Sequence, residues 1–471
     1  MANQKKENSI VTSSSAATVD MRTMKLRGRH LWIVFVASLG QLVGTAVATV
    51  VGVIIPLLNI RMHPELSSFM QGLIGCIDLV GIALGSVIFG RHSDRYGYLL
   101  FFRLCPALVA VASIVSILVQ DVAVLTVCLF FVGLGIGGEY SLDSDYISEL
   151  MPEKWGSLMV GVGKAASALG NIIAAALCLW IIMEARDADV WPRLMWIIAA
   201  IAVLMLLVRI RFWQSPEWLI NHGKVAEAEQ DVKNFLGPDV EISEADKSPA
   251  VVSAKSGLFQ FVKENGKKVV LSGIPWACEG LGVYGIGIFL PILVMALGLE
   301  HFYPGEPEVL HVADSVRITL WISCIILPGF ILGLIMIRRN MKLPAIQTWG
   351  FALCAVSLVV LLLAYHLKWD KWIAIGAFMA FELFLNMGPH LVTYVLPPHI
   401  YPVTTRGQGV GLAASIGKVG AVLGVFFIPI LLKAGGADLV LIVSAAVMVV
   451  GALVTGIFAP LVQREMKSAK S

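Results

Sequence analysis

The sequence predicts an all-α membrane protein with twelve transmembrane helices in two pseudo-symmetric bundles of six. Three observations support this fold class. Hydrophobic residues make up 58% of the 471-residue chain and charged residues only 14%, whereas a soluble protein carries about 25% charged residues. The hydrophobic residues fall in runs of about 20 or more, the length that crosses a bilayer core. The longest polar stretch, 212–268, divides these runs into two sets of six.

The twelve predicted spans, in order, cover residues 31–58, 67–90, 98–120, 122–147, 157–183, 192–210, 269–297, 314–337, 344–366, 372–396, 406–432 and 438–461. They define a cytoplasmic tail at 1–30, a first bundle at 31–211, a linker with helices at 212–268, a second bundle at 269–462 and a tail at 463–471. Spans three and four are separated by almost nothing around Asp121. The first run is too long for a signal-peptide core, so we expect no cleavage.

The distribution of basic residues predicts the orientation, because Lys and Arg accumulate in cytoplasmic loops. With the N-terminus inside, cytoplasmic segments hold 25 of the 35 Lys and Arg residues, including nine from Arg209 to Lys268. We therefore expect a multi-pass protein of the plasma (inner) membrane with both termini cytoplasmic.

Two sets of six spans predict an internal repeat. At an offset of 250 residues four identities fall at the join between the fourth and fifth span of each half: Pro152 with Pro402, Val160 with Val410, Gly161 with Gly411 and Gly170 with Gly420. In the linker, Ser215–Pro216–Glu217 and the Lys224–Asn234 run predict a capped, partly amphipathic helix.

Several classes of protein are disfavoured. All seven cysteines lie in apolar runs, which indicates neither a disulfide framework nor a metal site, and no cofactor is predicted. Nothing in the charge distribution points to nucleic acid. Motifs of metalloproteases and serine hydrolases are missing from the sequence, so we do not expect an enzyme.

Ionisable residues inside a bilayer are candidate functional residues, because burying a charge there is costly. They are Asp78, Glu139, Asp143, Asp145, Lys164, Glu279, Glu382 and Lys418. Glu139 and Asp143 are four residues apart and share a helix face. Proton coupling requires a buried carboxylate that takes up and releases a proton, and we favour Glu139, then Glu279 and Asp143. Alternatively, the span-four acids only cap the helix or face water.

Lys164 and Lys418 lie among small residues, which let helices approach closely. A buried ammonium group needs a carboxylate of the protein or an anionic substrate as partner. For Lys164 the favoured prediction is an ion pair with a span-four carboxylate.

Spans seven and ten carry further candidates. Trp276 and Tyr284 lie two turns apart on nearly one face, with Glu279 and four glycines that allow the helix to bend. In span ten Glu382, Asn386 and His390 recur every four residues as a polar stripe. His390 could make the site pH-sensitive. The alternatives are an aromatic-belt role for Trp276 and a structural hydrogen bond for His390.

Several motifs in order resemble the major facilitator superfamily, and within it the sugar porters and the metabolite or phosphate:proton symporters. Gly90–Gly97, with Asp94 and Arg95, is similar to the loop between spans two and three. Other matching segments are Gly133–Tyr140 with Ser148, Glu149 and Pro152; Ser215–Leu219; and Gly388–His390 through Pro397, Pro402, Arg406, Gly417 and Lys418.

The resemblance implies a secondary transporter that works by alternating access, commonly as a monomer. Gly90, Asp94, Arg95, Gly97 and Arg406 would act in gating. Lys418 takes the place of a substrate-contacting lysine of the phosphate symporters, which also carry a Trp, acid and Tyr series like that of span seven. We therefore expect the substrate at Glu139, Tyr140, Asp143, Lys164, Trp276, Glu279, Tyr284, Asn386, His390 and Lys418.

The chain also departs from the pattern. Basic residues of the family are replaced here by Tyr98–Leu99, Leu129 and Gly156. Fewer charges are therefore available for the ion pairs that close the cytoplasmic side in the family, which we call the charge latch. Gly44 and Val47 stand where symporter-like members carry aspartates in span one. A uniporter or an antiporter mechanism is therefore an alternative to proton symport.

The sequence favours a transporter of a small polar, anionic metabolite coupled to protons, because Lys164, Lys418 and His390 face the interior in this reading. A neutral sugar porter is the main alternative. A transporter-like ligand sensor is the second, motivated by the thinned latch.

Overall fold

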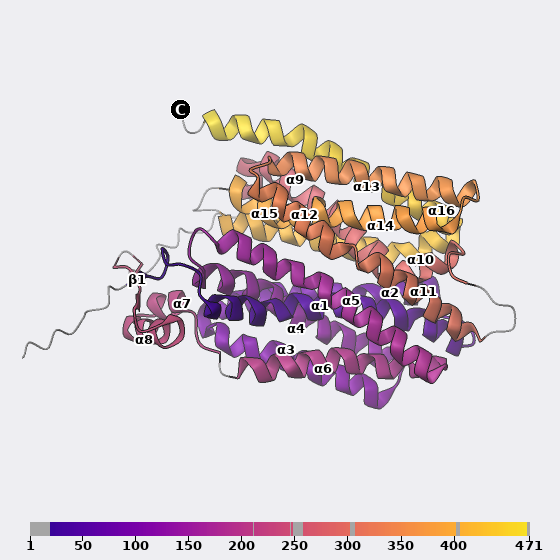
Figure 1. Ribbon diagram of the computed structural model, residues 1–471, viewed down its shortest axis with the longest axis horizontal. Coiled ribbons are helices and arrows are strands. Elements are labelled where there is room, and N and C mark those ends of the chain that lie inside the picture. Colours follow the sequence, from indigo (N-terminus) through magenta and orange to yellow (C-terminus); the bar gives the residue numbers. More distant parts are fainter. Residues whose placement is uncertain are drawn as a thin grey trace, which may run out of the picture.

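The computed structural model describes residues 19–210, 212–244, 246–247, 258–301, 307–401 and 406–468. Nearly all of these residues are helical, and the long helices run side by side along one axis (Figure 1). The first half contains α1 (Gly28–Arg61), α2 (Ser68–Tyr96), α3 (Tyr98–Val119), α4 (Val122–Leu150), α5 (Gly156–Ala185), η1 (Ala188–Val190) and α6 (Trp191–Arg209).

The linker and the second half follow. The linker contains α7 (Pro216–Asn221), α8 (Val225–Leu236) and strand β2 (Val240–Glu241), which pairs with β1 (Val19–Asp20). The second half contains α9 (Leu258–Gly280), η2 (Leu281–Ile286), α10 (Leu290–Ala296), α11 (Glu308–Ser323), α12 (Ile326–Arg338), α13 (Leu343–His366), α14 (Lys371–Met387), α15 (Pro389–Ile400) and α16 (Arg406–Ser468).

The number of spans agrees with the predicted fold class. Among the described residues, eleven helical stretches are long and apolar enough to cross a membrane. The last of them lies in α16, where Gly435 and Gly436 have non-helical backbone angles. This break divides α16 into two helices of membrane length, which brings the spans to twelve.

Polar side chains set several helix starts by accepting hydrogen bonds from free backbone amides. The Ser67 hydroxyl accepts from the amide of Met70 at 3.3 Å at the start of α2. The Asp121 carboxylate accepts from the amides of Ala123 and Val124 at 2.9 and 3.0 Å. Asp121 therefore marks the boundary between α3 and α4, as predicted.

The segment Gly90–Gly97 differs from the predicted loop, because α2 continues to Tyr96. Gly97 alone connects α2 to α3, with φ at +88°, a conformation that favours glycine. The side-chain oxygen of Gln214, from the segment after α6, accepts hydrogen bonds from the amides of Tyr98 and Leu99 at 2.9 and 3.3 Å. These bonds provide acceptors for two backbone amides that have no partner within the first turn of α3.

The second half contains three interrupted spans. η2 is a π-helical turn between α9 and α10, at the glycine-rich stretch where a bend was predicted. Gly388 separates α14 from α15, and Cys324 and Ile325 separate α11 from α12. The eighth span begins at Glu308 and not at 314. Asp314 lies inside this helix with polar partners: it accepts from the amide of His301 at 2.7 Å and lies 2.5 Å from Arg317.

The linker forms two short helices where the sequence predicted one. Gly223, with φ at +74°, lies in the turn between α7 and α8. Ser215 caps α7 by accepting from the amide of Trp218 at 3.1 Å. In Figure 1 β1, α7 and α8 lie together at one end of the bundle, and α16 ends on the same side. We call this the linker end.

Close helix packing at equivalent positions of the two halves supports the repeat. A Cβ atom on Gly170 would lie 2.2 Å from the Leu42 carbonyl, so α5 packs against the backbone of α1. At Gly420, 250 residues later, a Cβ atom would lie 2.5 Å from the carbonyl of Ala277, so α16 packs equally closely against α9.

The two halves lie against each other along their length. In Figure 1 α3, α4 and α6 lie in the lower part of the view, and α13, α15 and α16 lie in the upper part. Between the halves, α2 packs against α16, and α5 packs against α11 and α12. The interior between α1, α5, η2, α11 and α14 holds the polar residues described next.

Candidate functional site

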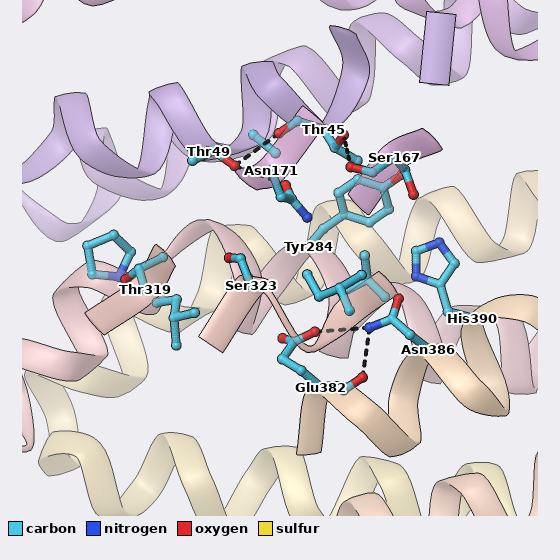
Figure 2. A pocket seen from close by; sticks show the side chains of 16 residues that line it. Thr45, Thr49, Ser167, Asn171, Tyr284, Thr319, Ser323, Glu382, Asn386 and His390 are labelled. Carbon is cyan, nitrogen blue, oxygen red and sulfur yellow. Dashed lines mark hydrogen bonds between the residues drawn. The ribbon is translucent and has the colours of Figure 1, made fainter. Parts of the chain in front are cut away.

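A cavity lies between the two halves (Figure 2). Its walls come from α1 and α5 of the first half and from η2, α10, α11, α12, α14 and α15 of the second. About 650 Å³ there is free of protein atoms, counting the part that opens to solvent. The polar side chains on its wall are Thr45, Thr49, Ser167, Asn171, Tyr284, Thr319, Ser323, Glu382, Asn386 and His390.

The first-half wall is a set of uncharged hydrogen-bonding groups. The Thr45 hydroxyl donates to the Ser167 carbonyl at 2.7 Å, and the Thr49 hydroxyl donates to Asn171 Oδ1 at 2.9 Å. These bonds join α1 to α5. Figure 2 shows the Asn171 amide nitrogen directed into the cavity, and among the described residues it has no hydrogen-bond partner. It is a donor available to a ligand.

The second-half wall carries the polar stripe that the spacing predicted. Asn386 Nδ2 donates to the carbonyl of Glu382 at 2.8 Å and to its Oε2 at 3.1 Å. His390 follows on α15, just beyond the Gly388 break, and also lines the cavity. The structure thus brings Asn386 and His390 to one wall, with Glu382 beside them.

Lys164 on α5 is buried next to this cavity. Its Nζ donates to Gln41 Oε1 at 3.0 Å and lies 4.5 Å from the centroid of the Tyr394 ring. Tyr394 stacks on the cavity-lining His390 with their centroids 6.2 Å apart. The predicted ion pair between Lys164 and a span-four carboxylate does not form with Glu139 or Asp143, because these two acids pair with Arg209, as described below.

Lys418 on α16 approaches from the other half. Its Nζ donates to the Tyr284 hydroxyl at 3.2 Å, and Tyr284 lines the cavity. The ring of Tyr140 is close to both lysines, with its centroid 5.4 Å from Lys164 Nζ and 5.1 Å from Lys418 Nζ. Cations over aromatic rings gain electrostatic stabilisation, which favours both ammonium groups here.

The charge balance around the two lysines is unusual. Among the described residues, neither ammonium group lies within 4.0 Å of a carboxylate. Glu279 is buried and close enough to interact electrostatically with both. Its Oε1 lies 3.4 Å from His390 Nδ1. The lysines are therefore held by rings, a hydroxyl and an amide oxygen, with Glu279 near both and the buried Asp78 carboxylate also close enough to interact electrostatically with Lys418.

Trp276 belongs to the same cluster. Its ring packs edge-on against Tyr394 with centroids 4.9 Å apart. A Cβ atom on Gly417 would lie 2.6 Å from the Trp276 ring, so the glycine before Lys418 admits the indole. Trp276 is buried, which disagrees with an aromatic-belt role.

Glu139 and Asp143 form a separate cluster with Arg209, away from the cavity wall. Arg209 is fully buried, and its guanidinium binds Glu139 and lies 3.3 Å from the Asp143 carboxylate. It also donates to the Val36 carbonyl at 3.2 Å and lies over the Phe102 ring at 4.6 Å. The assignment of Arg209 to a cytoplasmic loop is therefore corrected: it ends α6 inside the protein.

This cluster is incompletely hydrogen-bonded. Glu139 Oε1, Asp143 Oδ2 and Arg209 Nε are buried with no partner among the described residues. A Cβ atom on Gly40 would lie 2.2 Å from Asp143 Oδ2, so the glycine leaves room for the acids. Two carboxylates share one guanidinium, which leaves one negative charge in excess when both are ionised.

The predicted gating residues lie at the linker end. Arg95 lies over the ring of Tyr96 at 5.2 Å, and Gly90 packs near Ser141. The side chains of Asp94 and Arg406 fall outside the part of the chain that the structure describes, so their predicted role stays a prediction.

The first-span positions expected to carry aspartates are filled differently. A Cβ atom on Gly44 would lie 2.1 Å from the Tyr140 hydroxyl oxygen, so Tyr140 occupies the place of a side chain at position 44. Val47 is fully buried in the hydrophobic core. Position 44 has no room for a side chain in this packing, and an aspartate at position 47 would place a carboxylate among hydrophobic residues.

The comparisons with known proteins agree with this architecture. The family model described as sugar (and other) transporter matches residues 2–265 and 308–466. The chain belongs to this family of transporters. Among its relatives is the inner membrane metabolite transport protein YgcS of Escherichia coli, 26% identical over 401 residues, 84% of each chain. A probable inorganic phosphate transporter of Arabidopsis thaliana is 25% identical over 80% of each chain.

Solved structures show the fold. The xylose transporter XylE of Escherichia coli, in a partially occluded inward-open conformation, matches with a TM-score of 0.74 and 17% identity, over 91% of this chain and 97% of that one. Another XylE structure is described as a major facilitator superfamily proton:xylose symporter. This sugar transporter family member therefore has the major facilitator fold. Its relatives are transporters and not enzymes.

Sequence reasoning missed several residues of the site. Two pairs of polar residues spaced by four lie on the facing helices α1 and α5: Thr45 with Thr49, and Ser167 with Asn171. This spacing was not recognised as a site because Ser and Thr are common in membrane spans. Arg209 was missed because it stands at the polar edge of span six. Tyr394 was hidden in an apolar run.

Proposed function

We propose that this transporter moves a small anionic metabolite across the inner membrane by alternating access, in symport with protons. The observation that carries the anion assignment is the meeting of Lys164 and Lys418 at the Tyr140 ring, one lysine from each half. Buried ammonium groups need anionic partners. Glu279 and, for Lys418, Asp78 act on the lysines only at longer range among the described residues, so an anionic ligand would supply a direct partner.

The position of the lysines suits alternating access. Lys418 binds Tyr284 and Lys164 lies against Tyr394, and each of these rings borders or stacks on the cavity wall. An anion between the halves would attract both lysines and draw the halves together. Movement of the halves around a central site is how such transporters expose it to each side in turn. In this proposal the linker end is cytoplasmic, with both termini.

Proton coupling is assigned to the Glu139, Asp143 and Arg209 cluster, with Glu279 as the second candidate. The excess negative charge of two buried carboxylates on one guanidinium is costly, and one proton removes it. Glu139 directly precedes Tyr140 on α4. In this proposal a change in the pairing of Glu139 is transmitted through α4 to the Tyr140 ring, which is close to both lysines.

Uptake into proteoliposomes tests this function. Labelled D-gluconate, inorganic phosphate and D-glucose are offered with and without an inward proton gradient. Accumulation of an anion above equilibrium supports the proposal. Glu139→Gln should abolish this accumulation but spare exchange across the membrane without a gradient. Glu184→Gln, an exposed acid on α5, is the control. Unchanged accumulation by Glu139→Gln would remove this residue from coupling.

A neutral sugar is the second candidate, and one specific observation favours it. The cavity wall presents hydroxyl and amide groups from Thr45, Asn171, Ser323 and their neighbours, the groups that bind sugar hydroxyls. Gradient-driven accumulation of D-glucose with neither anion transported would favour this reading.

A further inference from the structure

Two parts of the cavity wall differ in their chemistry. One border consists of Tyr284 and His390, behind which lie the ammonium groups of Lys418 and Lys164. The rest of the wall carries hydroxyls and amides and one carboxylate, Glu382. No Lys or Arg lines the cavity itself among the described residues.

The uncharged wall favours a ligand with several hydroxyl groups. The hydroxyls of Thr45, Thr49 and Thr319 donate to backbone or amide oxygens at 2.7, 2.9 and 2.8 Å, which leaves their oxygens free to accept. The Asn171 amide nitrogen is a free donor. A polyol both donates and accepts at each hydroxyl, so it can satisfy this mixed wall.

Glu382 restricts the charge of the ligand at that end. Its carboxylate is buried and accepts from Asn386. A second carboxylate or a phosphate next to it would be repelled without a cation to compensate. A ligand hydroxyl can instead donate to the free lone pairs of Glu382. The charge of the ligand must then lie at the lysine border.

From this polarity we infer that the substrate is a sugar acid, with its carboxylate at the Tyr284 and His390 border, attracted by Lys418 and Lys164 behind it, and its hydroxylated body along Thr45, Asn171, Ser323 and Glu382. This inference rests on the proposed anion transport and narrows it to one class. It excludes inorganic phosphate and dicarboxylates as preferred substrates, because neither combines one charged end with a hydroxylated neutral end.

Binding to the purified full-length protein tests the inference. Affinities are measured by calorimetry for D-gluconate, D-glucose, D-lactate, inorganic phosphate and the zwitterion L-threonine. The expected result is that D-gluconate binds about tenfold or more tightly than each of the others, because only it uses both ends of the site.

The possible failures are distinguishable. If phosphate or D-lactate equals D-gluconate, anion transport stands but the sugar-acid class is wrong. If L-threonine is preferred, Glu382 binds an ammonium group and the class is again wrong. If D-glucose binds as tightly as D-gluconate, the anion assignment fails as well.

Two variants test where the carboxylate end and the hydroxylated end of the ligand bind. Lys418→Ala should weaken D-gluconate about tenfold and leave D-glucose unchanged, whereas Asn171→Ala should weaken both sugars and leave D-lactate unchanged. Lys433→Ala, an exposed lysine on the same helix as Lys418, is the control. If Lys418→Ala weakens both sugars equally, the carboxylate does not lie at Lys418 and the inference falls. Lys418→Arg, which keeps the charge, should retain the preference for D-gluconate and guards against a folding defect.

Discussion

At the scale of single residues, charge balance decides which side chains pair. Sequence reasoning identified Glu139, Asp143 and Lys164 as buried but assigned the wrong cation to the acids. A lysine in the middle of a predicted span is identified as a buried charge, whereas an arginine at the end of a span is assigned to the adjoining polar loop. The tertiary fold brings Arg209 to the acids, and no local pattern encodes that contact.

Arg209→Met provides a test at this scale. Removing the guanidinium leaves two buried carboxylates without their cation, and loss of one partner of a buried ion pair costs about 3–5 kcal/mol. We expect a clearly lower melting temperature of the purified protein in detergent. Arg193→Met, at an exposed position of the same helix, should melt like the unchanged protein.

The matched rescue is the triple variant Glu139→Gln, Asp143→Asn, Arg209→Met, which removes the uncompensated charge and should recover much of the loss. If the triple variant melts no higher than Arg209→Met, the destabilisation comes from lost packing on Phe102 and not from charge.

At the scale of elements, the N-terminal segment is bound to the linker. Val19 and Met21 donate backbone hydrogen bonds to the carbonyls of Asp239 and Glu241 at 2.8 and 2.9 Å. Arg27 binds the Asp239 carboxylate through two nitrogens, one of them at 2.9 Å. The sequence predicted a helical linker and a polar tail but not this contact, because a two-residue strand leaves no periodic pattern.

Arg27→Ala should release this segment. The side-chain hydrogen bond from Arg27 holds the pKa of Asp239 below its usual value. Since the pKa is lowered in the folded state, the stabilisation is present above the usual carboxylate pKa of about 4 and is lost as the pH falls through the lowered value.

Hydrogen exchange of the Val19 and Met21 amides measures this attachment. Protection should be high at neutral pH, fall in strong acid, and be low at all pH values in Arg27→Ala. The exposed neighbour variant Lys25→Ala should keep the protection. Equal protection in Arg27→Ala and the unchanged protein would show that the strand pairing holds by itself.

At the scale of the whole molecule, most of the fold could be predicted and the arrangement of the site only partly. Hydrophobic runs predicted the twelve spans, because the bilayer sets their length. The π-turn at η2, the break at Gly388 and the fold of the linker depend on packing between segments far apart in the chain. The cavity wall was missed for the same reason, since α1, α5 and α11 supply it together.

Gly52 tests how the halves meet at the end opposite the linker. A Cβ atom on Gly52 would lie 2.0 Å from the Ile288 carbonyl, so α1 and the second half touch there through backbone. Gly52→Leu should hold the halves apart at that end. Spin labels at Glu65→Cys and Lys368→Cys, both exposed, should report a longer distance in a Cys324→Ser background, which removes the exposed native thiol.

Gly376→Leu is the matched control, because a Cβ atom there meets no neighbour. An unchanged distance in Gly52→Leu would mean that the contact with Ile288 yields locally and does not set the spacing of the halves.

The contact between Gly44 and the Tyr140 hydroxyl makes the two positions epistatic. An aspartate at position 44 is sterically blocked while Tyr140 is present, yet becomes possible once a smaller side chain stands at position 140. The order of substitutions therefore matters for any lineage that gains or loses an acid in the first span. An acid can enter position 44 only after Tyr140, whose ring is close to both Lys164 and Lys418, has been replaced.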